Sequence, residues 1–225
     1  MKKIKYYMGC GLMVMSVVMS ACGDLYETHE EYLKMGEETY IGLAGNLEAN
    51  GGFNRIELKW ELNADPRIST CVITWSDSEK PLEFAADRSE EFMSKIIDLP
   101  EGKYIFQVVV KSDSGKESLP QTVSGEVYGA NYQSRLSQRG TKSVKNTAEG
   151  ITIQWAPEEG CVGVNLIYTD KDGNEQKLLV PGDEETTIIP DAVPGSEYVQ
   201  TSLFKPEVNA IDNIESLPST KVFPN

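Results

Sequence analysis

Residues 169–177, "TDKDGNEQK", carry the residue types of a calcium-binding loop. Asp170, Asp172 and Asn174 stand at alternate positions, and carboxylate and amide oxygens are the ligands that calcium prefers. A calcium loop of this kind needs a glycine at the sixth place and a glutamate that closes it. Here Gly173 stands at the fourth place and a proline takes the closing position. We therefore predict a β-hairpin that turns at Asp-Gly, and no metal site.

The chain offers few residues for catalysis. Its single histidine, His29, lies near the N-terminus, so neither a histidine-based triad nor a histidine-rich metal site can be assembled. Acidic residues are numerous, but glycoside hydrolysis needs two carboxyl groups held at a set separation in a cleft. We predict that the protein is not an enzyme and that it uses no cofactor.

Cys22 follows a short apolar segment that lysines precede. Residues 1–21 begin with Lys2, Lys3 and Lys5 and end in small residues, which is the layout of a secretory signal. The apolar part is shorter than the roughly 20 residues of a spanning helix. Small residues directly before a cysteine resemble the cleavage site of a bacterial lipoprotein signal, and this resemblance implies that Cys22 carries the lipid anchor. The alternative is an ordinary signal peptide that contains a cysteine.

An acidic segment comes directly after the predicted anchor. Residues 22–38 include Asp24, Glu27, Glu30 and Glu31, and we predict that they form a tether. The segment resembles the acidic tethers of surface-exported lipoproteins of Bacteroidota-type bacteria. A solvated spacer whose charge provides solubility is a second and compatible interpretation.

The charge of the chain excludes one class of partner. Its 21 basic and 35 acidic residues give a net charge of −14, and removal of residues 1–21 takes away three lysines and no acids, so that 18 minus 35 leaves −17. Because such a surface repels anionic polymers, we expect no nucleic-acid partner.

The chain aligns with itself at spacings of 93 to 98 residues, which suit a duplicated domain. The motif "ESLP" occurs at 117–120 and again at 215–218. Aromatic residues also align between the copies, and we expect the first four of them to pack in the core: Trp60 over Trp155, Trp75 over Tyr168, and Tyr104 over Tyr198.

Each copy contains short β-branched and aromatic runs that Gly, Pro, Asp and Asn interrupt, which predicts an all-β fold of two tandem antiparallel β-sandwiches. "LPEGKY" and "VPGSEY" resemble the tyrosine corner of fibronectin type III modules, which share an immunoglobulin-like fold; the resemblance implies that the tyrosine hydroxyl bonds back to the chain. The second copy matches more closely, because the first inserts Glu101. We predict a signal peptide at 1–21, a tether at 22–38, sandwiches at 39–127 and 147–225, and a basic connector at 128–146.

The whole chain, including "HEEYLKMGEETY" and "EVYGANYQSRLSQR", resembles an uncharacterised family of Bacteroidota surface lipoproteins. The resemblance implies a surface-exposed protein on the cell outer membrane, attached to the membrane through its lipid anchor. We predict a binding or display role that is accessory to glycan capture, with a polysaccharide as partner. The alternative is an adhesion or spacer protein that binds other surface proteins.

Candidate ligand contacts come from two segments. The connector carries basic residues and no acid, so it either binds an acidic saccharide or packs between the acidic sandwiches. A loop after the last aromatic motif is four residues longer in the second copy, since 19 residues separate Tyr198 from Leu217 and 15 separate Tyr104 from Leu119; it either recognises a ligand or is a tolerated insertion. From these segments, and from aromatic residues that we expect to be open to solvent, the candidates are Tyr128, Tyr132, Arg135, Arg139, Phe204, Asn209, Asp212 and Asn213.

Two smaller predictions concern local structure. Asn131 is expected to cap a short helical turn that Gly140 ends. Cys71 and Cys161 each begin an apolar run, one in each copy, and we predict that both are free, buried thiols.

Overall fold

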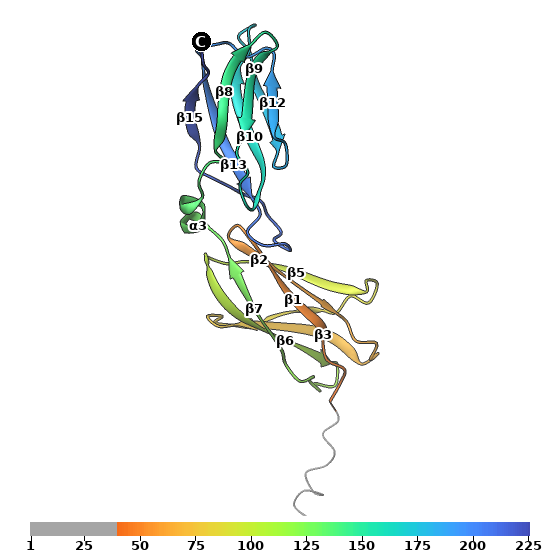
Figure 1. Ribbon diagram of the computed structural model, residues 1–225. Helices are drawn as coiled ribbons and strands as arrows, with labels where there is room; N and C mark the ends of the chain where they lie inside the picture. The colour runs from red at the N-terminus through yellow and green to blue at the C-terminus, as the bar shows by residue number, and fades with distance from the viewer. Residues whose placement is uncertain (1–39) are drawn as a thin grey trace, which may run out of the picture. The chain divides into compact units, whose positions relative to one another are not determined.

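Antiparallel β-sheets make up nearly all of the regular secondary structure in this computed structural model, which describes residues 40–225 (Figure 1). Residues 41–225 cluster into one compact unit. The predictions for the signal peptide, the Cys22 anchor and the acidic tether lie outside the described residues. Alternation of buried and less buried residues along the strands, as in β2, turns one face of each sheet towards a core. The predicted all-β fold of tandem antiparallel sandwiches is confirmed.

The first sandwich consists of a three-stranded sheet, in the order β1-β2-β5, and a four-stranded sheet, in the order β4-β3-β6-β7. Its strands are β1 (Gly45–Gly52), β2 (Arg55–Glu61), β3 (Ile68–Trp75), β4 (Leu82–Ala85), β5 (Phe92–Asp98), β6 (Gly102–Ser112) and β7 (Gln121–Val127).

The second sandwich repeats this plan with the sheets β12-β9-β8 and β11-β10-β13-β14, with β15 also paired to β13. A short helix, α3, precedes it. The elements are α3 (Ala130–Arg135), β8 (Thr141–Thr147), β9 (Gly150–Trp155), β10 (Cys161–Thr169), β11 (Glu175–Pro181), β12 (Thr186–Ile189), β13 (Glu197–Phe204), β14 (Ile214–Glu215) and β15 (Ser219–Val222). Strand β8 begins inside the segment predicted as a connector. Its backbone pairs with β9, while its polar side chains stay largely outside the core.

Each sandwich has its own hydrophobic core. Trp60 is fully buried in the first and Trp155 nearly so in the second, each among a separate set of aliphatic residues. Tyr168 is buried as expected, whereas Trp75 is half-buried and packs at the edge of the first core. The alignment of the two copies therefore identified core positions.

The repeated "ESLP" motif performs the same task in both sandwiches. The Ser118 N–H donates to the carbonyl of Val110, and its hydroxyl accepts the N–H of Val110 at 3.1 Å. In the second sandwich, the Ser216 N–H donates to the Ser202 carbonyl and the Ser216 hydroxyl accepts the Ser202 N–H, each at 2.8 Å. In both copies the serine side chain extends the pairing of a core strand by one residue.

The tyrosine corner is formed in the first sandwich in spite of the inserted Glu101. The Tyr104 hydroxyl donates to the Pro100 carbonyl at 3.0 Å. In the second sandwich Tyr198 is buried and stacks on Phe223, with ring centroids 4.2 Å apart and 13° between the planes. The bond back to the chain is thus present in the copy that matches the motif less closely.

The predicted hairpin turn joins β10 to β11. Gly173 has a φ of +85°, and its N–H donates to the Asp170 carbonyl at 3.1 Å. The Asp170 carboxylate accepts the N–H groups of Asp172 and Asn174 and the side-chain amide of Gln176, which lowers its pKa. Among residues 40–225, no group of three or more His, Cys, Asp or Glu residues is arranged to hold a metal ion.

Both predicted thiols are free and buried. Cys71 lies in the first core and Cys161 in the second. Burial raises the pKa of the Cys71 thiol to about 11 and raises that of Cys161 as well, so both are poor nucleophiles at neutral pH.

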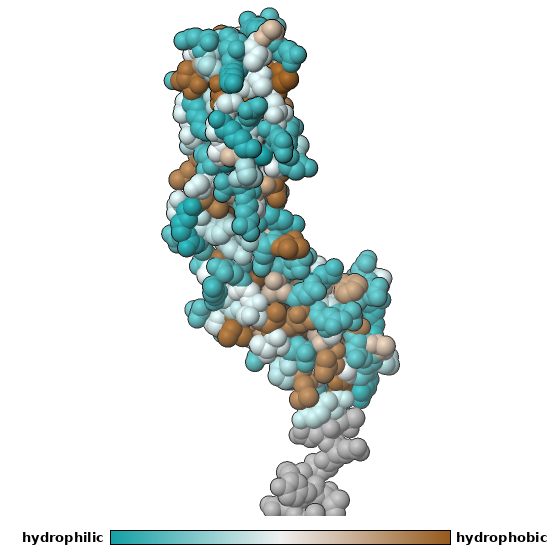
Figure 2. Space-filling view, viewed as in Figure 1, coloured by the Kyte–Doolittle hydropathy of each residue, from teal (hydrophilic) through white to brown (hydrophobic). Residues whose placement is uncertain are grey.

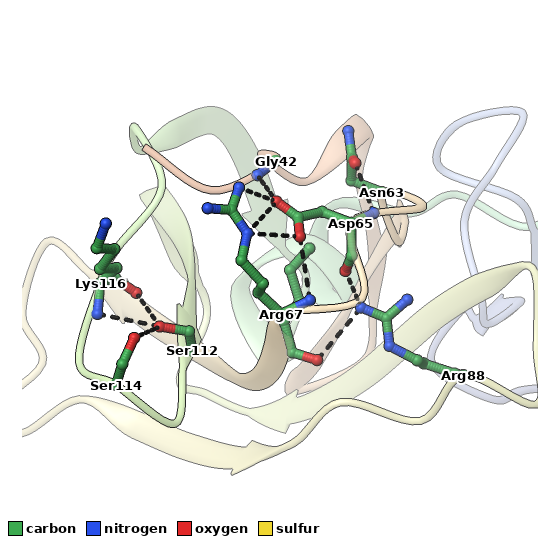
Figure 3. A network of polar contacts seen from close by, with 9 residues as sticks. Gly42, Asn63, Asp65, Arg67, Arg88, Ser112, Ser114 and Lys116 are labelled. Carbon is green, nitrogen blue, oxygen red and sulfur yellow. Dashed lines mark hydrogen bonds and ion pairs between the residues drawn. The ribbon is translucent and has the colours of Figure 1, made fainter. Parts of the chain in front are cut away.

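A polar network fastens the segment before β1 to the loop between β2 and β3 (Figure 3). Asp65 accepts the backbone N–H of Gly42 at 3.0 Å and binds the Arg67 guanidinium through both carboxylate oxygens. Arg88 donates to the backbone carbonyls of Asp65 and Ile68. This network covers the end of the first sandwich at which the described residues begin.

Candidate functional site

Three segments that are distant in sequence meet at the turn between β1 and β2. The first is the turn itself, the second is Tyr128, which directly follows β7, and the third is the long loop 205–213. Tyr128 donates its N–H to the Gly52 carbonyl at 3.0 Å and accepts the Asn54 N–H at 2.7 Å, so that Phe53 and Tyr128 form a parallel bridge. We call this meeting point the joint.

Asp212, in the long loop of the second sandwich, binds the β1–β2 turn of the first. Its Oδ1 accepts the Nη2–H of Arg55 at 2.6 Å, and its Oδ2 accepts the Nε–H of Arg55 and the backbone N–H of Phe53, each at 2.9 Å. The bidentate pairing with Arg55 lowers the pKa of the Asp212 carboxyl. This predicted ligand contact therefore has an intramolecular partner.

Two glycines allow the loop to approach the turn. A Cβ on Gly51 would lie 2.3 Å from the Glu126 carbonyl oxygen, and one on Gly52 would lie 2.5 Å from the Asp212 carboxylate. Without a Cβ at these positions, the two segments come close enough for a backbone hydrogen bond, in which the Ile211 N–H donates to the Gly51 carbonyl at 2.9 Å. The pair of glycines is thus a requirement of the joint.

Glu101, the residue inserted into the tyrosine corner, caps helix α3. Its two carboxylate oxygens accept the backbone N–H groups of Asn131 and Tyr132, each at 2.7 Å. The prediction that Asn131 caps the helix is wrong: Gly129 is the N-cap residue, and the side chain that satisfies the first turn comes from 30 residues earlier. The helix ends at Arg135, with Leu136 as its C-cap residue, and so stops before the predicted Gly140.

Helix α3 and the chain after it are fastened to the second sandwich by side-chain amides. Gln133 donates to the Glu215 carbonyl at 2.9 Å, and Gln138 donates to the Leu217 carbonyl. Gln200, which is fully buried, donates to the carbonyl of Arg139 at 2.9 Å. The connector is therefore tied by Glu101 to the first sandwich and by these bonds to the second.

Arg139 is not part of an exposed basic surface. It is only 3% exposed, and its guanidinium donates to the backbone carbonyls of Ala156, Pro181 and Glu184 at 2.9 to 3.2 Å. It also lies 5.3 Å from the centre of the Trp155 ring. The side chain closes one end of the second sandwich, and the three carbonyls rather than acidic residues hold its charge.

Two of the three aromatic candidates are buried, so the expectation that they are open to solvent is wrong. Tyr128 is 8% exposed and Phe204 7%, and Tyr132 is half-buried, with its ring 4.8 Å from that of Tyr128. Burial, with smaller contributions from Glu207 and Glu126, raises the pKa of Tyr128 to about 12. Their polar sequence neighbours suggested exposure, but the joint covers Tyr128 and the second core covers Phe204.

Arg135, Asn209 and Asn213 are exposed, and their contact with a ligand stays a prediction. Sequence reasoning missed Arg55 and Glu101. The signal for Glu101 was present, because the residue interrupts an otherwise regular motif. Nothing near Arg55 in the sequence points to a partner 157 residues away.

Comparison with known proteins places the chain in a family. The model of DUF4998, a domain of unknown function, matches residues 22–214. The chain belongs to the DUF4998 family. The match covers the first sandwich, the joint and the second sandwich up to the start of β14.

Two solved structures show low similarity to this DUF4998 chain. A two fibronectin type III domain segment from chicken tenascin is 17% identical, with a TM-score of 0.34, over 82% of this chain and 100% of that one. The FN1–FN3 domains of chicken CNTN1 are 13% identical, with a TM-score of 0.45, over 83% of this chain and 66% of theirs. No curated protein matches the chain.

Proposed function

We propose that the chain is a non-catalytic display protein of the bacterial cell surface, in which the joint sets the position of the second sandwich. The observation that carries the proposal is the contact of Asp212 with Arg55 and Phe53. Asp212 belongs to the loop that is longer in the second copy. Residues that the first copy lacks therefore hold the two sandwiches together. Side chains used in this way are not available to bind a ligand at the same place.

The anchor is the second part of the proposal. We propose that Cys22 carries the lipid and that the chain is exposed on the outer membrane. The lysines at the start of residues 1–21 and the small residues directly before Cys22 support this proposal. Among the described residues, no helix has the length and apolarity needed to cross a membrane.

A distance measurement between the sandwiches tests the joint. Spin labels on cysteines that replace the exposed Lys80 and Lys177 should give a narrow distance distribution in the full chain. Asp212→Ala should broaden it, because Arg55 and the Phe53 N–H lose their acceptor. Asn213→Ala, a change of the exposed neighbouring residue, should leave it narrow. A broad distribution in the unmodified chain would contradict the proposal.

Cell fractionation tests the anchor. Cys22→Ala should move the protein out of the membrane fraction, and retention there would contradict the lipid assignment. Replacement of Asp24, Glu27, Glu30 and Glu31 by neutral residues should keep the protein in the membrane and reduce its cleavage by external protease.

The displayed surface is proposed to serve glycan capture, with adhesion to another surface protein as the rival. On the face that Figure 2 shows, hydrophobic residues are interspersed with hydrophilic ones. Affinity gels that contain neutral polysaccharides distinguish the two roles. Retarded migration of the protein supports glycan capture, whereas unchanged migration together with capture of a surface protein supports adhesion.

A further inference from the structure

A cavity of about 510 Å³ lies on the three-stranded sheet of the first sandwich, away from the joint. The six residues that line it come from β1, β2 and β5: Asn46, Leu47, Glu48, Lys59, Glu61 and Phe92. Its volume falls in the range of small-ligand sites, about 300 to 1,000 Å³. None of these residues was a candidate in the sequence.

An irregular strand shapes this cavity. The register between β1 and β2 shifts between Gly45 and Glu48, where β1 carries one extra residue. Asn46, in this bulge, has a φ of +44°, a left-handed conformation that is uncommon outside glycine. Its side-chain amide donates to Glu61 Oε1 at 2.7 Å, which fixes the orientation of both groups. Bulges and strained residues of this kind cluster at functional sites, where they re-aim side chains.

Phe92 and Leu47 provide the apolar part of the lining. The Phe92 side chain is 40% exposed although it lies on a sheet, and the Lys59 ammonium lies 4.8 Å from the centre of its ring. An exposed ring on a sheet face can stack against the C–H groups of a flat, partly apolar ligand. The polar groups around it include both donors, on Asn46 and Lys59, and acceptors, on Glu48 and Glu61.

The charges around the cavity select the class of ligand. Two carboxylates face one ammonium, in a chain of net charge −14, so an anionic ligand is repelled. A cationic ligand is disfavoured because the Lys59 ammonium, which lies over the ring, repels a second positive charge there. A neutral ligand that is rich in hydroxyl groups can use the donors, the acceptors and the ring together.

We propose that the cavity bounded by Asn46, Glu48, Lys59 and Phe92 binds a residue of a neutral polysaccharide. The exposed part of the Phe92 ring packs against the sugar ring, and Asn46, Lys59 and Glu48 form hydrogen bonds with its hydroxyl groups. The proposal deepens the proposed glycan-capture role and rests on it, whereas it does not depend on the joint.

The test uses the full chain in detergent on native gels that contain soluble starch, xylan, galactomannan or mixed-linkage β-glucan. We expect retardation on at least one of them, and Phe92→Ala should weaken it by about tenfold or more in dissociation constant, the loss of about 1.4 kcal/mol. Ile96→Ala is the matched control, since Ile96 is on the same strand, is 49% exposed and lies outside the cavity lining. Asn46→Gly should also weaken binding, because it removes the amide while accepting the positive φ.

Each other outcome overturns a defined part of the proposal. Retardation that is equal in Phe92→Ala and the unmodified chain would refute this site and leave glycan capture standing. Absence of retardation on all four polysaccharides would refute both. Binding to polygalacturonate or to a lysine-rich peptide that depends on Phe92 would refute the neutral-saccharide assignment.

Discussion

The two sandwiches place a tryptophan at corresponding positions but treat its indole nitrogen differently. In the second, the Trp155 Nε1–H donates to the Thr187 hydroxyl at 2.9 Å. In the first, the Trp60 Nε1–H has no oxygen or nitrogen partner among the described residues, although it is buried. It lies beside the Cys71 thiol. Duplication has thus kept the apolar packing of the core, while the polar satisfaction around it has diverged.

The loops differ more than the cores. The first sandwich offers the glycine-containing turn between β1 and β2, and the second provides the longer loop that binds it. The inserted Glu101 is likewise found in one copy alone, where it caps α3. The comparison teaches that shared residues maintain each sandwich, whereas residues present in one copy join the two.

Removal of either tryptophan ring tests the shared part. Trp60→Ala and Trp155→Ala should each lower the free energy of unfolding by about 3–5 kcal/mol, because each leaves a large cavity in a separate core. Urea denaturation followed by circular dichroism measures the loss, with Leu217→Ala, a change of an exposed residue, as control. A loss below about 1 kcal/mol for either ring would contradict the shared core role.

Replacement by phenylalanine sharpens the difference between the tryptophans. Trp155→Phe leaves the buried Thr187 without its donor, whereas Trp60→Phe breaks no hydrogen bond to oxygen or nitrogen. Trp155→Phe should therefore cost about 1–2 kcal/mol more in the free energy of unfolding. Equal costs in the same urea experiment would show that the Thr187 bond adds nothing.

The joint should respond to acid. The pKa of Asp212 is lowered by Arg55, so the docked loop is stabilised at pH values above the ordinary aspartate pKa of about 4 and loses this stabilisation as the pH falls through the lowered value. Asp212→Asn should increase amide hydrogen exchange at Phe53 by about tenfold at neutral pH and remove the acid dependence. Exchange at Phe53 that is unchanged by the substitution would contradict the docking.

The smallest expected effect concerns the serines of "ESLP". Ser118→Ala and Ser216→Ala each leave a buried strand N–H without its side-chain acceptor, and each should cost about 1 kcal/mol in the free energy of unfolding. The two costs should agree within about 0.5 kcal/mol, since the bonds match in both copies. A large difference, seen in parallel urea titrations, would show that the repeated motif has diverged in its task.

Local pattern predicted much of the fold and little of the joint. The core positions of Trp60 and Trp155 follow from the alignment of the chain with itself. The strands and the Asp-Gly turn at Gly173 follow from alternation and turn chemistry, which act over a few residues. The bonds from Asp212 to Arg55, and the burial of Tyr128, depend on how two folded units meet. Such contacts leave no periodic signal in one sequence, and for this reason polar neighbours misled the expectation for Tyr128.

The cavity around Phe92 was missed for a related reason. Phe92 follows an acidic, turn-like segment and looks like an ordinary strand residue, and Asn46 gives no sign of its left-handed backbone. The pairing of β5 with β2 places Phe92 beside Glu61, and the register shift between β1 and β2 lies at Asn46. A bulge is a property of strand pairing and cannot be recognised from one strand.

The two buried cysteines allow the opening of each sandwich to be measured by thiol alkylation. Because Cys71 and Cys161 lie in different cores and each thiol is shielded from reagents, alkylation of either one requires its own sandwich to open. Mass spectrometry of the alkylated peptides would then time the two openings separately in a single sample. Equal alkylation rates would indicate that the two sandwiches open together. Unequal rates would show which sandwich has the greater kinetic stability.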